Sequence, residues 1–432
     1  MDVLSSYNII IEISLIIILS FVFSEISRKT NVPSVLMLIL LGIVLKFGLD
    51  ALGLGSLDFF PILEVLGIIG LIMIVLEAAL ELELKPEKML PIGKALLIAL
   101  VCLLLSAWVA AIILYQFVPG MTMSAAWLYA TPLSILSSAI IIPSVAGLNN
   151  EKKEFHIYES TFSDILGIML FYFLSGQIEA TGEGHSNGVG GFFANVLLTI
   201  VISLVASYLI ILIFQNIRSN VKLFLLIAVL LLLYAIGKKM HLSSLIIILI
   251  FGLLIANMPL FFQGKLGRLL HVERAKNIYE GLHVITMETA FVVRTLFFVI
   301  FGLTISLAAL FSWQVAMISG LIILSIYVIR FIILRIFLGS DILPQLFVAP
   351  RGLITILLFY AIPKEIQVEG FEPGILLFII ITSSVIMTVA MVHDKQRMNE
   401  AVKKAQSMPV GYEKWKAPTL QSVAETGDKE KH

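Results

Sequence analysis

The feature that most restricts the fold of this chain is a long succession of apolar segments. Most are about 17–25 residues long, enough for a helix to cross a ~30 Å hydrocarbon layer. Hydrophobic residues make up 59% of the chain and charged residues 13%, against about 25% charged residues in soluble proteins. We therefore expect an all-α polytopic membrane protein with about 13 transmembrane helices, near residues 8–26, 33–49, 61–83, 92–118, 124–147, 155–178, 191–215, 221–238, 242–260, 278–308, 313–338, 344–362 and 372–393.

Composition also narrows the range of functions. The formal net charge is zero, so no overall field attracts nucleic acid, and we expect no nucleic-acid partner. The single cysteine, Cys102, has no metal-ligand neighbours. Histidines do not cluster with cysteines or carboxylates. We expect no cofactor and no resident metal, and an enzyme is the least favoured class.

Basic residues at the ends of the segments indicate the orientation. The loops after odd-numbered segments, with the helix ends beside them, carry thirteen Lys and Arg residues, and those after even-numbered segments carry four. Because cytoplasmic loops are enriched in Lys and Arg, the N-terminus is expected outside and the C-terminus inside the cell membrane. The polar tail, residues 394–432, is expected to be a frayed helix followed by disorder.

Asp164 lies deep within the sixth segment. If the helix begins near Phe155, Asp164 is about 13 Å along it, near the middle of the hydrocarbon layer. An ionisable side chain at this depth indicates a functional site. Ser160, Thr161 and Gly167 lie on the same helix face. The alternative is an Asp that only hydrogen-bonds a neighbouring helix.

Two segments are expected to be broken helices. The fifth contains Thr131-Pro132 and Ser137-Ser138, and the twelfth contains Pro350-Arg351-Gly352. Proline removes a backbone donor, and Ser and Gly weaken a helix, so each segment can unwind and present backbone groups to an ion. The two are seven segments apart and so run in opposite directions, as in an inverted repeat of segments 1–6 and 8–13. Simple proline kinks are the alternative.

A second buried charge, Arg330, lies about 12 Å from the cytoplasmic end of segment 11 and at the depth of Glu159 and Asp164. A buried Arg needs a carboxylate. Glu159 is preferred because this pairing leaves Asp164 free, although Asp164 is the alternative. Arg294 is either a buried partner or an anchor, and Glu77 and His156 are expected to be interfacial.

These features together resemble the monovalent cation:proton antiporter superfamily, with its sodium/proton exchanger-like membrane domain. The resemblance covers roughly residues 8–393 and rests on four stretches in the right order. Glu159-Ser-Thr-Phe-Ser-Asp164 looks like the family's Glu-Ser-x-x-Asn-Asp segment, and Arg330 matches a basic residue on a facing helix. Leu296-Phe-Phe-Val-Ile-Phe-Gly-Leu303 and Pro350-Arg-Gly-Leu-Ile354 also read like family segments.

The resemblance implies a homodimer that works by an elevator-like movement. Residues 1–393 would form the antiporter domain, with the crossed broken helices in a core around 92–178 and 278–393 and a dimerisation part around 8–83 and 221–260. Two departures concern the ion. Ser163 replaces the Asn or Asp before Asp164, and Ser137-Ser138 stand where many members have Asp-Pro. A single carboxylate then serves the transported ion, with Glu159 and Arg330 as a fixed charge pair.

The expected function is exchange of a monovalent cation for H⁺, with both competing for Asp164 and with Na⁺ preferred to K⁺ as the cation. Hard oxygen donors would complete the ion site: Ser163, Ser137, Ser138, Thr131 and freed backbone carbonyls. One carboxylate holds one ion or the other, so exchange should be electroneutral and serve pH homeostasis. The alternatives are K⁺/H⁺ exchange, a cation channel, or a membrane sensor on the same fold.

Overall fold

The computed structural model shows a helical protein. It describes residues 6–30, 34–51, 60–82, 84, 86–182, 189–217, 222–239, 244–262, 272–304 and 312–407. The chain divides into two units, Met1–Met391 and Val392–His432, and the fold below is that of the first. In the second, residues 392–407 continue the last helix, and the disorder expected for the rest of the tail falls outside the described residues.

Helices form all the long elements of the described chain, and none of its residues lies in a strand. Three short 3-10 turns, η1 (Pro86–Lys88), η2 (Val145–Gly147) and η4 (Lys364–Ile366), lie between them. In chain order the helices are α1 (Ser6–Thr30), α2 (Ser34–Ala51), α3 (Phe60–Glu81), α4 (Met89–Phe117), α5 (Met123–Ser134), α6 (Ser138–Ser144), α7 (Asn150–Gly182), α8 (Val189–Phe214), α9 (Lys222–Lys239), α10 (Ser244–Ala256), α11 (Met258–Phe261), α13 (Val272–Thr304), α14 (Trp313–Leu338), α15 (Leu353–Tyr360) and α16 (Gly374–Ser407).

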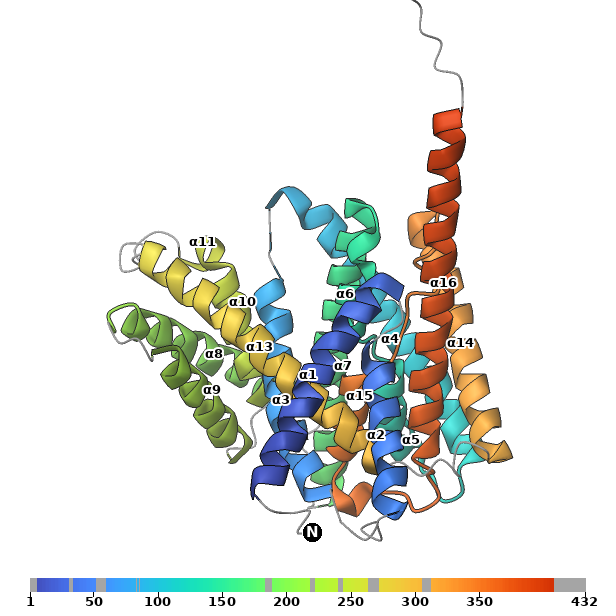
Figure 1. Ribbon diagram of the computed structural model, residues 1–432. Coiled ribbons are helices and arrows are strands. Elements are labelled where there is room, and N and C mark those ends of the chain that lie inside the picture. Colours follow the sequence, from blue (N-terminus) through green and yellow to red (C-terminus); the bar gives the residue numbers. More distant parts are fainter. Residues whose placement is uncertain are drawn as a thin grey trace, which may run out of the picture. The chain divides into compact units, whose positions relative to one another are not determined.

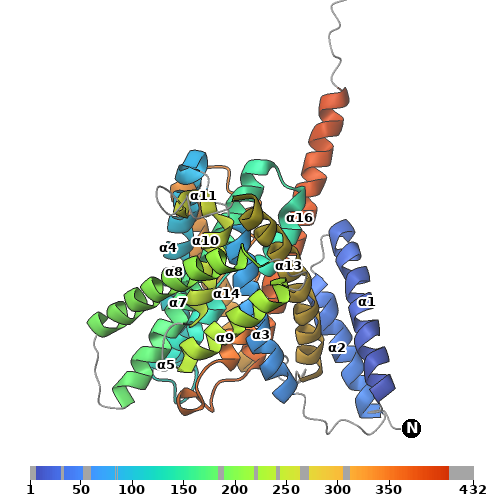
Figure 2. The same ribbon diagram turned by 90° about the vertical axis from the view of Figure 1, so that its left-hand side faces the viewer.

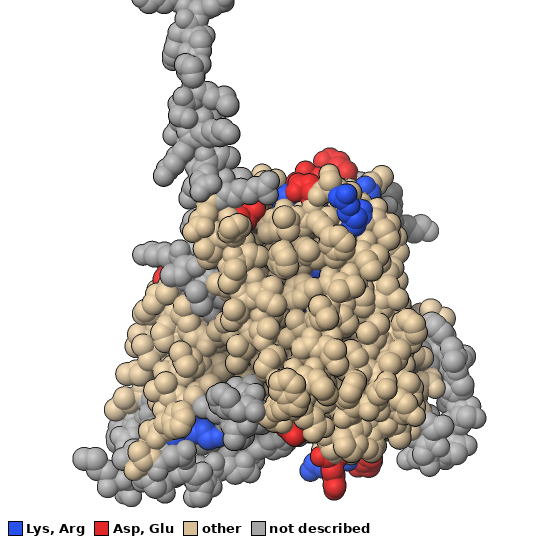
Figure 3. Space-filling model, turned by 90° about the vertical axis from the view of Figure 1, so that its right-hand side faces the viewer, with Lys and Arg blue, Asp and Glu red and all other residues tan. Residues whose placement is uncertain are grey.

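Each expected segment contains at least one helix, and the described residues form an all-helical fold, which confirms the fold class. Within the described residues, seven helical segments are long and apolar enough to cross a membrane: Met89–Phe117, Met123–Ser144, Asn150–Ile178, Leu197–Phe214, Glu273–Thr304, Trp313–Leu338 and Gly374–Asp394. Shorter apolar helices accompany them, at Ser14–Ile26, Ser34–Leu49, Lys222–Gly237 and Leu245–Ala256. On the face drawn in Figure 3, most charged side chains gather toward the two ends of a broad uncharged region, as expected of a surface surrounded by hydrocarbon.

Both broken segments are present. The fifth segment unwinds at residues 135–137 between α5 and α6. The twelfth has turns at residues 343–347 and no regular secondary structure from residue 348 through Gly352, before α15 begins. The two breaks touch, because Ser137 N donates to the Pro350 carbonyl at 3.0 Å. They occupy matching places in the two halves of the chain, and this contact brings them together in the middle of the fold.

Two sets of helices pack around this crossing (Figures 1 and 2). In one set, α13 lies along α2 and α3, and α10 joins α3 to α8 and α9. In the other, α4 packs against α5, α7 and α14. The contact between α2 and α13 is close because Gly42 of α2 faces Gly302 of α13. A Cβ on Gly42 would lie 2.1 Å from the Val299 carbonyl oxygen. Segment 10 was expected in the core around 278–393, and the structure places its helix, α13, along α2 and α3.

Candidate ion-binding site

The break between α5 and α6 leaves three consecutive backbone N–H groups, those of Leu136 and Ser137 in the break and of Ser138 at the start of α6, without an acceptor in their own helix. Buried backbone donors need acceptors, and each finds one on a neighbouring segment: Leu136 N donates to Ser163 Oγ (3.0 Å), Ser137 N to the Pro350 carbonyl (3.0 Å) and Ser138 N to Asp164 Oδ2 (3.3 Å). The break is therefore held by α7 and by the second broken segment. These contacts bring Asp164, Ser163, Ser137 and Ser138 together.

The two carboxylate oxygens of Asp164 differ in their contacts: Oδ2 accepts the hydrogen bond from Ser138 N, whereas Oδ1 has no hydrogen-bond partner in the described part of the chain. The residue is 2% exposed. It lies on the wall of a cavity whose other lining residues are apolar, contributed by α3, α7, α10 and α15: Ile74, Val75, Ala78, Ile165, Ile168, Met169, Leu245, Ile246, Leu249 and Ile354. A bare carboxylate is costly in such surroundings, so either a proton or a cation is needed to neutralise it.

The candidate hydroxyl ligands near Asp164 differ in whether they already have a hydrogen-bond partner. Ser137 Oγ is buried without a partner among the described residues, and it lies so near the second break that a Cβ on Gly352 would be 2.5 Å from it. A glycine at position 352 is therefore needed for this close approach. Thr131 donates its hydroxyl to the Trp127 carbonyl of its own helix at 2.8 Å. No described contact joins Thr131 to Asp164.

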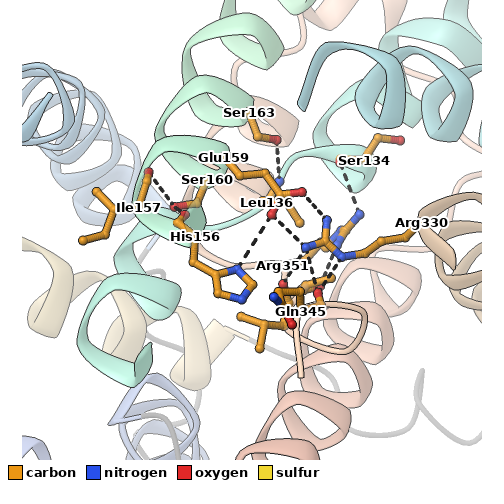
Figure 4. Close-up of polar contacts among 12 residues, drawn as sticks. Ser134, Leu136, His156, Ile157, Glu159, Ser160, Ser163, Arg330, Gln345 and Arg351 are labelled. Atoms are coloured by element: carbon orange, nitrogen blue, oxygen red, sulfur yellow. Dashed lines mark hydrogen bonds and ion pairs between the residues drawn. The ribbon is translucent and has the colours of Figure 1, made fainter. Parts of the chain in front are cut away.

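Glu159 and Arg330 form a two-pronged ion pair in the interior (Figure 4). Arg330 Nη1 and Nη2 lie 2.6 and 2.8 Å from the two Glu159 oxygens. The side chains are 0% and 3% exposed for Glu159 and Arg330. Arg330 also donates to the carbonyls of Gln345 and Val348 in the second broken segment. The guanidinium thus fixes this segment against α7 and α14, and the arrangement leaves Asp164 without an Arg.

Arg351 stabilises the end of α5. The last carbonyls of a helix have no partner within it, and Arg351 donates from Nε to Leu133 O (3.0 Å) and from Nη2 to Ser134 O (3.2 Å). Its backbone N donates to Ser383 Oγ on α16 at 3.0 Å. Arg351 is 2% exposed, so its charge is held in the interior by helix-end carbonyls, which carry partial negative charge.

His156 corrects an expectation from the sequence. It was expected at the membrane interface, but it is completely buried, and its Nδ1 lies 3.7 Å from Glu159 Oε2 (Figure 4). Helix α7 begins at Asn150 and extends beyond the expected start, so His156 lies almost two turns inside it. It therefore belongs to the surroundings of the charge pair.

A second cluster of charged side chains, which the sequence analysis did not predict, lies beside the ion site. Arg294 Nη2 of α13 binds Glu77 Oε2 of α3 at 2.7 Å. Glu81 lies one helical turn after Glu77. These three side chains line a cavity with Ser138, and this cavity shares the lining residues Ile74 and Ala78 with the cavity beside Asp164. The signal in the sequence was a pair of carboxylates four residues apart at the C-terminal end of segment 3.

Comparison with known proteins places this geometry in a broader context. The family described as "Sodium/hydrogen exchanger, transmembrane" matches residues 14–394. Two solved structures of the sodium proton antiporter MjNhaP1 from Methanocaldococcus jannaschii are similar in fold. One, at pH 8, has a TM-score of 0.64 and 20% identity over 89% of this chain and 95% of that one. The other, from electron microscopy, has a TM-score of 0.62 and 18% identity over 96% and 100%. No curated protein sequence gives a significant match.

Proposed function

Since the chain belongs to the sodium/hydrogen exchanger family and is accordingly a cation/proton antiporter of the membrane, we propose that it exchanges one Na⁺ for one H⁺ by alternating access. The two ions compete for Asp164. The observation that carries the proposal is the free Oδ1 of this buried carboxylate, at the crossing of two broken helices. Secondary transporters of this architecture hold their ions at such discontinuous helices near the midplane.

Competition follows from the surroundings of Asp164. Either a proton or a desolvated cation cancels its charge, and the two cannot occupy it together. The apolar cavity wall makes the uncompensated carboxylate the costly state, so movement of the core across the membrane barrier is cheap only with one ion bound. A cycle that crosses only when occupied exchanges one ion for the other.

The remaining charges near Asp164 keep fixed partners. Glu159 is neutralised by Arg330 in a close ion pair, and Arg351 is held by carbonyls at the end of α5. We propose that these groups keep their protonation through the cycle, so that Asp164 alone changes its occupant. The transported charge per step is then the same for Na⁺ and for H⁺.

The ligands favour a hard monovalent cation. At the crossing, Asp164 Oδ1 and Ser137 Oγ are buried without a partner among the described residues, with Ser138 and Ser163 close by. Carboxylate and hydroxyl oxygens suit alkali ions. Na⁺ is the proposed substrate because the family match and the similar antiporter structures carry sodium in their descriptions. K⁺/H⁺ exchange is the alternative, since the same oxygens can hold either ion.

The proposed setting is the cell membrane, with the N-terminus outside and the C-terminus in the cytoplasm, as the Lys and Arg distribution favours. The proposed assembly is a homodimer formed through residues around 8–83 and 221–260, with the core moving like an elevator. The packing of α13 on α2 and α3 supports adding α13 to the part of the fold that stays still.

The test measures proton movement in proteoliposomes with a pH-sensitive dye after separate additions of Na⁺, K⁺ and Li⁺. Wild type should show cation-triggered proton efflux, and Asp164→Asn should abolish it because an amide binds neither ion by charge. Asp341→Asn is the matched control, since Asp341 is 73% exposed and paired with Lys152 on the surface. The control should exchange like wild type.

Two outcomes would contradict the proposal. Folded, membrane-inserted wild type that moves no protons with any cation would overturn exchange and favour a sensor. Cation currents that follow the electrical gradient without proton movement would indicate a channel. If K⁺ alone triggers efflux, the exchange stands and the cation is K⁺.

A further inference from the structure

One backbone carbonyl near the ion site has lost its partner through a proline. In an α-helix the carbonyl of residue i accepts from the N–H of residue i+4. For Ala139, in the first turn of α6, that residue is Pro143, which has no N–H. Arg294 of α13 supplies a donor from outside the helix, with Nη1 at 3.4 Å from the Ala139 oxygen.

The same guanidinium also holds α3. Arg294 Nη2 lies 2.7 Å from Glu77 Oε2, and both side chains are mostly buried, at 16% and 18% exposed. Because α3 and α13 pack along each other, the ion pair joins two helices that already belong together. The contact with Ala139 instead reaches the first broken segment. Ala139 directly follows Ser138, whose N–H donates to Asp164 Oδ2.

We propose that Arg294 is a latch that positions α6, and with it Asp164, in the conformation of this structure. The inference rests on the alternating access proposed above. The two contacts differ in strength, because a close pair of opposite charges is stronger than a long hydrogen bond to a neutral carbonyl. When the core moves, Arg294 therefore keeps Glu77 and releases Ala139. The latch closes again when α6 returns.

A latch of this kind changes transport in a recognisable way. It raises the fraction of molecules in the conformation of this structure, in which, under alternating access, Asp164 is open to one side of the membrane only. The apparent affinity for an ion falls in proportion to the fraction of molecules that can bind it. Loss of the latch should therefore raise the KM for Na⁺ on that side and lower it on the opposite side. A group that touched the ion itself would shift both values in the same direction.

The experiment measures ²²Na⁺ flux in vesicles of both orientations and gives one KM for each side. Arg294→Gln removes the hydrogen bond to Ala139 together with the ion pair to Glu77. We expect shifts of opposite sign, each about three- to tenfold, which is the size expected for the lost hydrogen bond to α6. Lys276→Gln is the control, because it removes a positive charge from the same helix at an exposed pair with Glu280. The control should leave both KM values at those of wild type.

A second variant tests the latch with Arg294 intact. Pro143→Ala restores an N–H at position 143, so Ala139 gains a donor within its own helix and no longer depends on Arg294. It should shift both KM values in the directions seen for Arg294→Gln, and the double variant should show little further change. If Arg294→Gln fails to fold, Pro143→Ala decides alone.

The contrary results are distinct. KM values that stay at wild-type levels, or that shift in the same direction on both sides, in a folded variant would overturn the latch. Absence of ²²Na⁺/H⁺ exchange in wild type would instead overturn the proposed function. The two failures cannot be confused, since the latch is judged only by differences between active proteins.

Discussion

The buried ionisable side chains at the crossing have different surroundings, and these differences indicate their roles. Glu159 receives both prongs of Arg330, and Arg351 is held by carbonyls at the end of α5. Asp164 has one backbone donor and, within the described chain, one oxygen without a partner. A buried charge with fixed partners is structural, whereas one with an unfilled site can bind an exchangeable ion.

The charge pair yields a prediction about stability. Glu159→Gln leaves Arg330 buried without a counter-charge, which should destabilise the protein by about 3–5 kcal/mol. The double variant Glu159→Gln, Arg330→Met removes both charges and should recover part of the loss. Thermal unfolding in detergent measures both. Glu154→Gln, which removes a half-exposed partner of Lys88, should cost under about 1 kcal/mol. Equal unfolding temperatures for Glu159→Gln and this control would show that the pair is not needed for stability.

At the scale of elements, the site depends on how closely the first break approaches α7. Gly167 lies one turn after Asp164, and a Cβ there would be 2.3 Å from Ile135 Cγ1. Real Cβ atoms do not tolerate such a distance, so the break can lie here only because position 167 has no side chain. The hydrogen bonds from Leu136 to Ser163 and from Ser138 to Asp164 depend on that approach.

This close approach can be tested with two glycines on one helix. Gly167→Ala should push the break away from Asp164 and raise the KM for Na⁺ about tenfold or more, equivalent to the loss of one or two hydrogen bonds. Gly176→Ala is the matched control, because a Cβ at position 176 meets nothing within 4 Å. It should leave the KM unchanged and favour the helix slightly. Adding Ile135→Ala to Gly167→Ala should restore affinity. Equal KM values for the two single variants would contradict the argument.

Much of the fold was accessible from the sequence because bilayer thickness sets the length of each apolar segment. The two breaks were also predictable, since Pro132, Ser137, Ser138 and the Pro350-Arg351-Gly352 run each weaken a helix. Segment ends were less accurate. Helix α7 begins at Asn150 and not near Phe155. The prediction was late because the first turn of this helix is polar and carries no apolar signal.

The candidate site was only partly predictable, for a geometric reason. Glu159, Asp164 and Arg330 could be matched by depth, because counting residues from a helix end gives depth directly. The contact of Arg294 with Glu77 and Ala139 depends on the tilt and rotation of α13 against α3 and α6, which packing sets and a single sequence does not reveal. The burial of His156 was missed because the expected start of α7 was too late in the chain.

At the scale of the whole molecule, the proposed cycle fixes how transport responds to voltage. A core that crosses with Asp164 bearing either Na⁺ or H⁺ carries the same net charge in both directions, since Glu159, Arg330 and Arg351 keep their partners. A step that moves one uncompensated charge through the membrane potential would be driven by about 2.3 kcal/mol per 100 mV. One-for-one exchange through a single carboxylate should show no such force.

The corresponding measurement sets the membrane potential in proteoliposomes with a potassium gradient and valinomycin. Na⁺/H⁺ exchange should run at the same rate at 0 mV and at about −100 mV. When net exchange stops, the proton concentration ratio across the membrane should equal the imposed Na⁺ concentration ratio. The apparent KM for Na⁺ should rise as pH falls, because protons occupy Asp164 in its place. A second proton in each cycle would make the rate depend on voltage and carry the pH gradient away from the Na⁺ gradient. That outcome would require another carboxylate to change its occupant, and Glu81, whose Oε2 has no partner in the described chain, would be the first to replace with Gln.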